Sequence, residues 1–106
     1  KSQEERRNRE YEVSLVNALK NSYEGIEEIK ISNPTYTNSP DDWSCKVDIL
    51  FEDGEKIFYG IPHNLDEIEN YNGRMTYGQR DFLNRRKGIT TNTVTVTYSN
   101  KERGEQ

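Results

Sequence analysis

The sequence predicts an α+β fold, in which an N-terminal helix packs on a four-stranded antiparallel sheet and a short second helix precedes the last strand. Three observations predict this fold. Apolar side chains recur at helical spacing near the N-terminus, alternate with period two through a central hairpin, and alternate again in a threonine-rich segment near the C-terminus. With 106 residues the chain is expected to form one domain, spanning 11–100.

The first helix is expected over residues 4–23 and is followed by Gly25 as a left-handed cap. Its apolar side chains share one broad stripe of the helical wheel: Tyr11, Leu15, Val16, Ala18, Leu19 and Tyr23. Residues 1–10 (KSQEERRNRE) are charged and offer no side chain to a core. We therefore expect a charged stalk or a frayed helix start there.

The next elements are a strand and the central hairpin. Ile29 and Ile31 alternate within a strand expected over 26–33, and Pro34 marks an edge or an exit because it cannot donate to a ladder. Residues 34–42 are expected to form a loop or a ragged extension of this strand. The hairpin strands are expected at 43–52 and 55–62. One face of the first hairpin strand is apolar throughout: Trp43, Cys45, Val47, Ile49 and Phe51.

Two loop lengths are compatible with the Asp-Gly turn of this hairpin. A two-residue loop pairs Glu52 with Glu55, which places two like charges opposite each other. A three-residue loop puts Gly54 in the left-handed conformation as a bulge and sets Ile49 opposite Ile57. We favour the second register, because cross-strand apolar pairs contribute about 0.2–1 kcal/mol each.

The C-terminal half predicts a short helix and a last strand. Thr76 and Gln79 have the spacing of a capping box, so a helix is expected over 77–87. This helix would bury Phe82 and Leu83. The last strand is expected over 89–100, with a wet threonine face, and residues 101–106 are expected to be a polar tail.

Composition limits the classes of function. Net charge is −4, which gives no electrostatic argument for nucleic acid, and no apolar run approaches the length of about 18 residues that a membrane span needs. The only cysteine, Cys45, lies on the apolar strand face and is expected to be a small buried hydrophobe. We expect a monomer.

The sequence offers little for catalysis. His63 is the only histidine and is expected to be half-exposed at a strand end; the enzyme alternative is a small hydrolase or nuclease using His63 with a nearby carboxylate. The acidic loop 66–73 has Ile68 where a calcium loop needs its first carboxylate. Phosphate-loop, dinucleotide-binding, nucleophile-elbow and metal-ligand motifs are absent. We therefore expect no enzyme, no cofactor and no metal.

Two groups of residues are candidates for partner binding. Tyr36 and Trp43 are aromatic residues of the kind enriched at interfaces, although burial would also explain them, and the loop 34–42 around Tyr36 is the expected recognition loop. Arg85, Arg86 and Lys87 form a basic cluster at a predicted helix end, where cations offset the helix dipole by about 0.3–1 kcal/mol each. The alternative for this cluster is an anionic partner.

Residues 23–34 (YEGIEEIKISNP) and 42–58 (DWSCKVDILFEDGEKIF) resemble segments of small uncharacterised exported lipoproteins of low-GC Gram-positive bacteria. The order of a helix followed by a meander is also similar to cystatin-like folds, but their inhibitory motifs are not present. The lipoprotein resemblance implies an extracytoplasmic domain tethered to the outer face of the membrane through a lipidated cysteine upstream of Lys1.

These observations favour a non-enzymatic extracytoplasmic binding or interaction domain, with an unknown protein or cell-surface partner. The alternative within the binding class is an immunity or exclusion protein that blocks a toxin or phage component.

Overall fold

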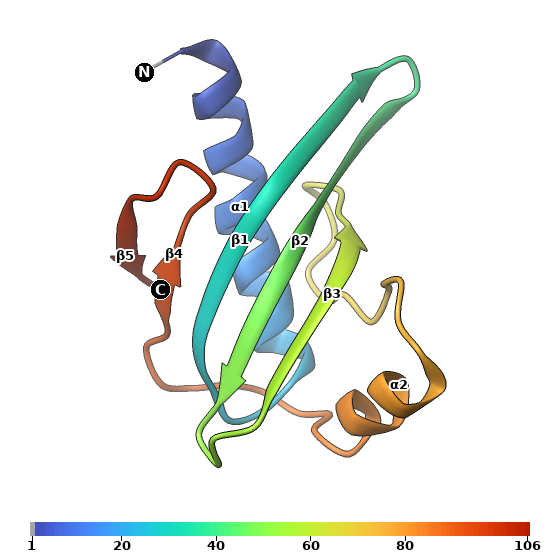
Figure 1. Cartoon of the computed structure of the whole chain (residues 1–106). Helices are drawn as coiled ribbons and strands as arrows, with labels where there is room; N and C mark the ends of the chain where they lie inside the picture. Colours follow the sequence, from blue (N-terminus) through green and yellow to red (C-terminus); the bar gives the residue numbers. More distant parts are fainter. Residues whose placement is uncertain (1) are drawn as a thin grey trace.

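The structure, a computed structural model, describes residues 2–106 and has two layers (Figure 1). Helix α1 (Gln3–Ser22) lies across one face of a five-stranded sheet, and helix α2 (Tyr77–Asn84) lies beyond the β3 edge. The strands are β1 (Ile26–Asn38), β2 (Asp41–Phe51), β3 (Lys56–Pro62), β4 (Thr95–Thr97) and β5 (Arg103–Glu105). Neither helix is long and apolar enough to cross a membrane.

The sheet is mixed, which corrects the expectation of four antiparallel strands. Its order is β3-β2-β1-β4-β5, and β1 and β4 run parallel while the other neighbours are antiparallel. After α2 the chain passes from the β3 side to the opposite edge of the sheet, as Figure 1 shows, and it enters β4 in the direction of β1. Such a long connection permits parallel pairing, whereas a tight hairpin turn does not.

The last strand is shorter than expected, and the expected polar tail contains β5. Val94 and Gln106 exchange two backbone hydrogen bonds of 2.7 and 2.9 Å, and the Tyr98 N–H donates to the Glu102 carbonyl at 2.8 Å. A turn at residues 99–101 therefore ends the predicted 89–100 segment and leads into β5, with Lys101 at φ 77°. The predicted facing is confirmed, because Val94 and Val96 are buried while the threonines of β4 are half-exposed.

The register of the central hairpin is the predicted three-residue form. Ile49 pairs with Ile57, and the Phe51 N–H donates to the Glu55 carbonyl at 2.9 Å. Gly54 has φ 87°, the left-handed conformation that this loop needs.

β1 is longer than expected, since it continues past Pro34 to Asn38. A bulge between Ser32 and Thr35 absorbs the irregularity, and Asn33 there has φ 52°. β4 pairs only with residues 28–30 of β1, so Pro34 lies where the strand has β2 on one side and no strand on the other. A missing N–H is tolerated at such an edge. Of the two forms expected for 34–42, the strand extension is the one observed, since β1 reaches Asn38 and β2 begins at Asp41.

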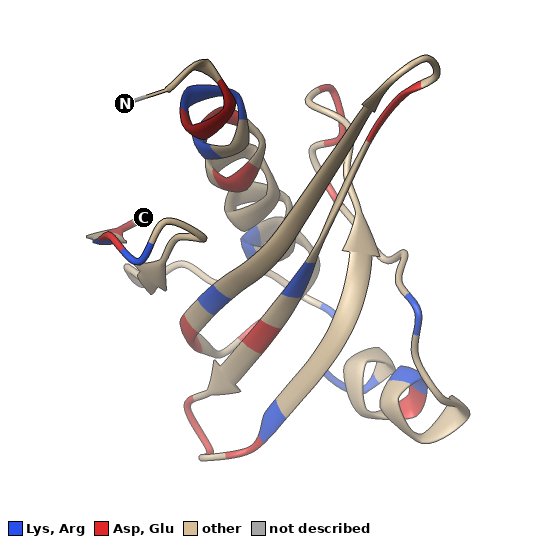
Figure 2. Cartoon of the chain, turned by 45° about the horizontal axis from the view of Figure 1, so that its top comes forward, with Lys and Arg blue, Asp and Glu red and all other residues tan. Residues whose placement is uncertain are grey.

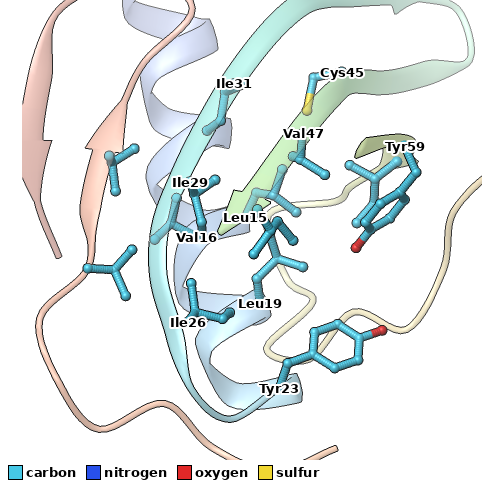
Figure 3. Close-up of a cluster of buried hydrophobic side chains, with 14 of the residues drawn as sticks. Leu15, Val16, Leu19, Tyr23, Ile26, Ile29, Ile31, Cys45, Val47 and Tyr59 are labelled. Carbon is cyan, nitrogen blue, oxygen red and sulfur yellow. The ribbon is translucent and has the colours of Figure 1, made fainter. Parts of the chain in front are cut away.

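The core lies between α1 and the inner face of the sheet. Figure 3 shows Leu15 and Leu19 of α1 against Ile26 and Ile29 of β1, with Val47 of β2 beside them, and all five are at most 1 % exposed. The opposite, outer face is not covered by any helix or strand of residues 2–106 (Figure 1). One face of each long strand is thus dry and the other is solvated.

Both helices begin as their caps require. The Ser2 side chain accepts from the Glu5 N–H, so the expected stalk or frayed start is ordered helix from Gln3 onward. The Thr76–Gln79 capping box is confirmed. α2 ends at Asn84, three residues before the predicted Lys87. Arg85 and Arg86 form a turn, and Lys87 then makes an antiparallel bridge to Tyr23, beside which the Arg86 carbonyl accepts from the Glu24 N–H at 2.8 Å.

Candidate functional site

The two aromatic candidates hold the β1–β2 hairpin on α1. Trp43 is 1 % exposed, stacks on Tyr11 with ring centroids 5.2 Å apart, and donates from Nε1 to Asn8 Oδ1 at 3.1 Å. Tyr36 is half-buried under the Arg7 guanidinium, 4.2 Å from its ring centre. Trp43 therefore presents no ring surface to a partner in this structure, and Tyr36 presents only part of one.

Arg86, in the basic cluster, is part of the packing. Its guanidinium lies over the rings of Phe51 and Phe82, at 4.5 and 4.2 Å from the ring centres. It also binds the Asp53 carboxylate at 2.8 Å, and this hydrogen bond lowers the pKa of Asp53. Arg86 thus fixes the β2–β3 turn against α2 and has its charge partner within the chain.

The other two members of the basic cluster differ in their surroundings. The Lys87 Nζ lies 5.0 Å from the centre of the exposed Tyr71 ring, a cation–π contact. Arg85 is exposed and its side chain has no acidic partner among the described residues. Arg85 and Arg86 line one hollow together with Glu24, Glu52 and Asp53, and Lys87 is not among its lining residues.

His63 is 1 % exposed, which corrects the expectation of a half-exposed residue. Its Nε2 lies 2.8 Å from Ser14 Oγ on α1, and its Nδ1 lies 3.4 Å from Asn70 Nδ2. Burial lowers the pKa of His63, and the nearby carboxylates of Glu67 and Asp66 oppose this effect. The neutral ring therefore sits in a chain of serine, histidine and asparagine side chains.

The direction of the hydrogen bonds in this chain follows from Asn70. Its Nδ2 donates to the Pro62 carbonyl at 2.8 Å and its Oδ1 accepts from the Asn72 N–H at 2.9 Å, so the amide nitrogen faces His63 Nδ1. Nδ1 must then accept, and the proton of the neutral ring lies on Nε2, which donates to Ser14. A histidine that acts as general base for a serine must accept the hydroxyl proton at an unprotonated ring nitrogen. Here Nε2 carries the ring proton and donates to Ser14, which is the opposite of the hydrogen-bond direction in a nucleophilic site.

Cys45 and the acidic side chains add no reactive centre. Cys45 is buried, as predicted, and burial raises the pKa of its thiol, which disfavours the reactive thiolate. Within residues 2–106 no group of three or more histidine, cysteine, aspartate and glutamate side chains is placed to hold a metal ion.

A groove of about 530 Å³ lies on the outer face between β1, β2, β3 and the segment that leads to α2. It adjoins the β1 bulge, where Asn33 adopts its positive φ. Bulges are frequent next to binding sites because they redirect side chains. Its lining residues are Asn33, Thr35, Asp42, Ser44, Cys45, Lys46, Gly60, Ile61, Pro62, Gly73 and Arg74. We refer to it as the outer groove.

Gly60 forms the floor of the outer groove. It pairs with Lys46 of β2 on one side and bridges to Arg74 on the other, where the Arg74 N–H donates to the Gly60 carbonyl at 2.8 Å. A Cβ at Gly60 would lie 4.0 Å from Lys46 Nζ, so the ammonium group reaches over the glycine. Among the other residues that line the groove, the hydroxyls of Thr35 and Ser44 are 2.8 Å apart.

Sequence reasoning did not identify the outer groove. The signal available was Gly60 itself, which interrupts an otherwise continuous strand pattern, since an isolated glycine in a strand often marks a close approach. Arg74 gave no such signal, because it lies in a segment without periodicity.

The chain closes the outer edge of β3 with its own residues. The outward carbonyls of Phe58, Gly60 and Pro62 accept from Gln79 Nε2, the Arg74 N–H and Asn70 Nδ2, at 3.1, 2.8 and 2.8 Å. A peptide strand therefore does not find a row of free acceptors at this edge.

Comparison with known proteins returned no matching family model, no matching curated protein and no matching solved structure.

Proposed function

We propose that this chain is a non-enzymatic extracytoplasmic binding domain and that the outer groove contacts its ligand. The observation that carries the proposal is a groove of about 530 Å³, lined by cationic and hydroxyl side chains, on the sheet face that no helix or strand of residues 2–106 covers. Concave sites with a few convergent polar groups are typical of ligand binding.

The hydrogen-bond direction at His63 supports a non-enzymatic role. The one histidine is buried and donates to Ser14, and both ring nitrogens are engaged in holding the 62–72 segment to α1. Its imidazole is not among the groups that line the outer groove. The polar groups of the groove and the titratable ring are thus separate features of the molecule.

The extracytoplasmic location and the lipid anchor follow from the resemblance of residues 23–34 and 42–58 to exported lipoproteins. Metabolic labelling of the full gene product with palmitate, together with protease treatment of whole cells, tests both. Labelling and cleavage at the cell surface would support the location, whereas an unlabelled and protected protein would overturn it.

Binding is tested with immobilised protein and the envelope fraction of the source cells. Wild-type protein should retain a specific partner, and Gly60→Val should lose it because the new side chain fills the groove floor. Lys30→Gln, on the same sheet face but outside the groove, should behave as wild type. Retention that is equal for all three proteins would contradict the proposed site, and a captured toxin or phage component would assign the domain to immunity or exclusion.

Catalysis is tested by incubation with chromogenic ester, peptide and phosphodiester substrates. The proposal expects no turnover above the buffer rate. Turnover by wild-type protein that is lost in Ser14→Ala would establish the hydrolase alternative instead.

A further inference from the structure

We propose that Lys46, Gly60 and Arg74 form a subsite of the outer groove for one singly charged oxyanion, a carboxylate or a phosphodiester, of the bound ligand. This inference rests on the proposed function, since it assigns ligand chemistry to the same groove.

The first argument is the register. Lys46 is directly opposite Gly60, and Gly60 is directly opposite Arg74, so all three positions project from the outer face. Directly opposed Cβ positions are about 5 Å apart, which places the Cβ atoms of Lys46 and Arg74 about 10 Å apart. The position between them has no side chain. Two long cationic side chains thus flank an open floor wide enough for an anion.

Figure 2 shows the same arrangement in the charge distribution. A positively charged stretch of β2 lies on one side of β3, and another lies on the segment before α2, while the middle of β3 carries no charge. Lys46, Gly60 and Arg74 therefore lie on three neighbouring segments, with a positive charge on each of the two outer ones.

The second argument is the lack of internal partners. Among the described residues neither Lys46 nor Arg74 has a carboxylate within ion-pair distance, whereas Lys30 lies 3.8 Å from Glu28 and Arg86 binds Asp53. Both side chains are exposed and line the same groove. Their charges are thus available to a ligand.

The third argument concerns the charge of the ligand. Asp42 lines the other part of the groove, so two cations and one carboxylate leave a single net positive charge. A monoanion matches this charge, and a planar guanidinium binds carboxylate or phosphate oxygens in a forked geometry. The hydroxyls of Thr35 and Ser44 are additional donors beside the subsite.

A ¹⁵N NMR titration tests the subsite, with two monoanions, acetate and dimethyl phosphate, as separate probes at constant ionic strength. The expected result is a saturating shift of the backbone amides of Lys46, Gly60 and Arg74, with those of β5 unmoved. Stronger saturation by acetate would favour a carboxylate ligand, and stronger saturation by dimethyl phosphate would favour a phosphodiester.

Four variants, one of them a control, decide the assignment. Lys46→Gln and Arg74→Gln should each lower the affinity for the probe anion by about tenfold, which is the equivalent of one lost charge-assisted hydrogen bond. Gly60→Val should abolish saturation. Lys30→Gln, the matched surface cation, should leave the affinity within twofold of wild type. Shifts spread over all lysines and arginines, or affinities unchanged in Lys46→Gln and Arg74→Gln, would show charge screening only and overturn the subsite.

The test separates this inference from the proposed function. Saturable anion binding without any envelope partner would support the subsite and contradict the proposed function. The converse outcome is an envelope partner that Gly60→Val no longer retains but that Lys46→Gln and Arg74→Gln retain as wild type does. This outcome would support the proposed function and contradict the anion subsite.

Discussion

The two faces of the same strands differ in nearly every physical respect. On β2, Val47 and Ile49 are fully buried under α1, while the alternate residues Lys46 and Asp48 lie on the face that no helix or strand of residues 2–106 covers. Adjacent residues in the chain therefore belong either to the core or to the outer groove and its surroundings. We therefore expect that substitutions at adjacent positions of one strand can change stability and ligand binding separately.

The largest expected effect is on the inner face. Ile49→Ala should lower the free energy of unfolding by about 2–5 kcal/mol, because a fully buried side chain is replaced by a cavity. Leu50→Ala, its half-exposed neighbour on the outer face, should lower it by less than about 1 kcal/mol. Urea denaturation of the two variants measures the difference, and equal losses would contradict the division between the faces.

The next effect separates two glycines of one hairpin. Gly54→Ala should destabilise the fold by about 1–2 kcal/mol, since φ is 87° and no atom lies near the added Cβ, so the loss is one of backbone conformation alone. Gly60→Ala should be nearly neutral, because its nearest contacts would be 3.9 and 4.0 Å. Thermal unfolding followed by circular dichroism compares them. A Gly54→Ala protein as stable as wild type would refute the loop conformation.

A smaller effect is expected from pH. Burial lowers the pKa of His63 in the folded protein, so the unfolded chain, with an ordinary histidine pKa of about 6.5, binds a proton more readily. The stability contributed by the neutral ring should be complete above this pKa and should decrease as the pH falls below it. In His63→Gln, which has no histidine, the slope between about pH 5 and pH 7 should disappear. A slope that persists would show that another group is responsible.

The smallest expected effect on stability is on the outer face. Lys46→Gln and Arg74→Gln should each change the free energy of unfolding by no more than about 0.5 kcal/mol, because neither side chain has an internal charge partner among the described residues. Arg86→Gln is the matched comparison and should be more destabilising, since it loses Asp53 and two aromatic rings. Urea denaturation of the three variants gives the order, and similar losses would contradict it.

The parts of the fold that depend on neighbours in sequence could be predicted. The apolar alternation of β2 and β3 determines which face is buried, and the Asp-Gly turn with one glycine at positive φ determines the register. The helix cap at Thr76 is likewise local. Each of these features is decided within a few residues.

The remaining features depend on contacts that the local pattern does not encode. Alternation in 93–98 predicts which residues face the core, but it does not predict that β4 pairs parallel with β1. His63 is buried because Ser14, 49 residues away, receives its hydrogen bond. The outer groove likewise unites Lys46 and Arg74 across Gly60, and their approach depends on the bridge between Gly60 and Arg74, which joins the segment before α2 to β3.

The most direct test of the division between the two faces is the paired measurement of stability and ligand retention for Gly60→Val. The account predicts a free energy of unfolding within about 1 kcal/mol of wild type, because the groove floor has room for the side chain, together with loss of the ligand. Stability and retention that fall together would contradict it, and so would a stable variant that still binds.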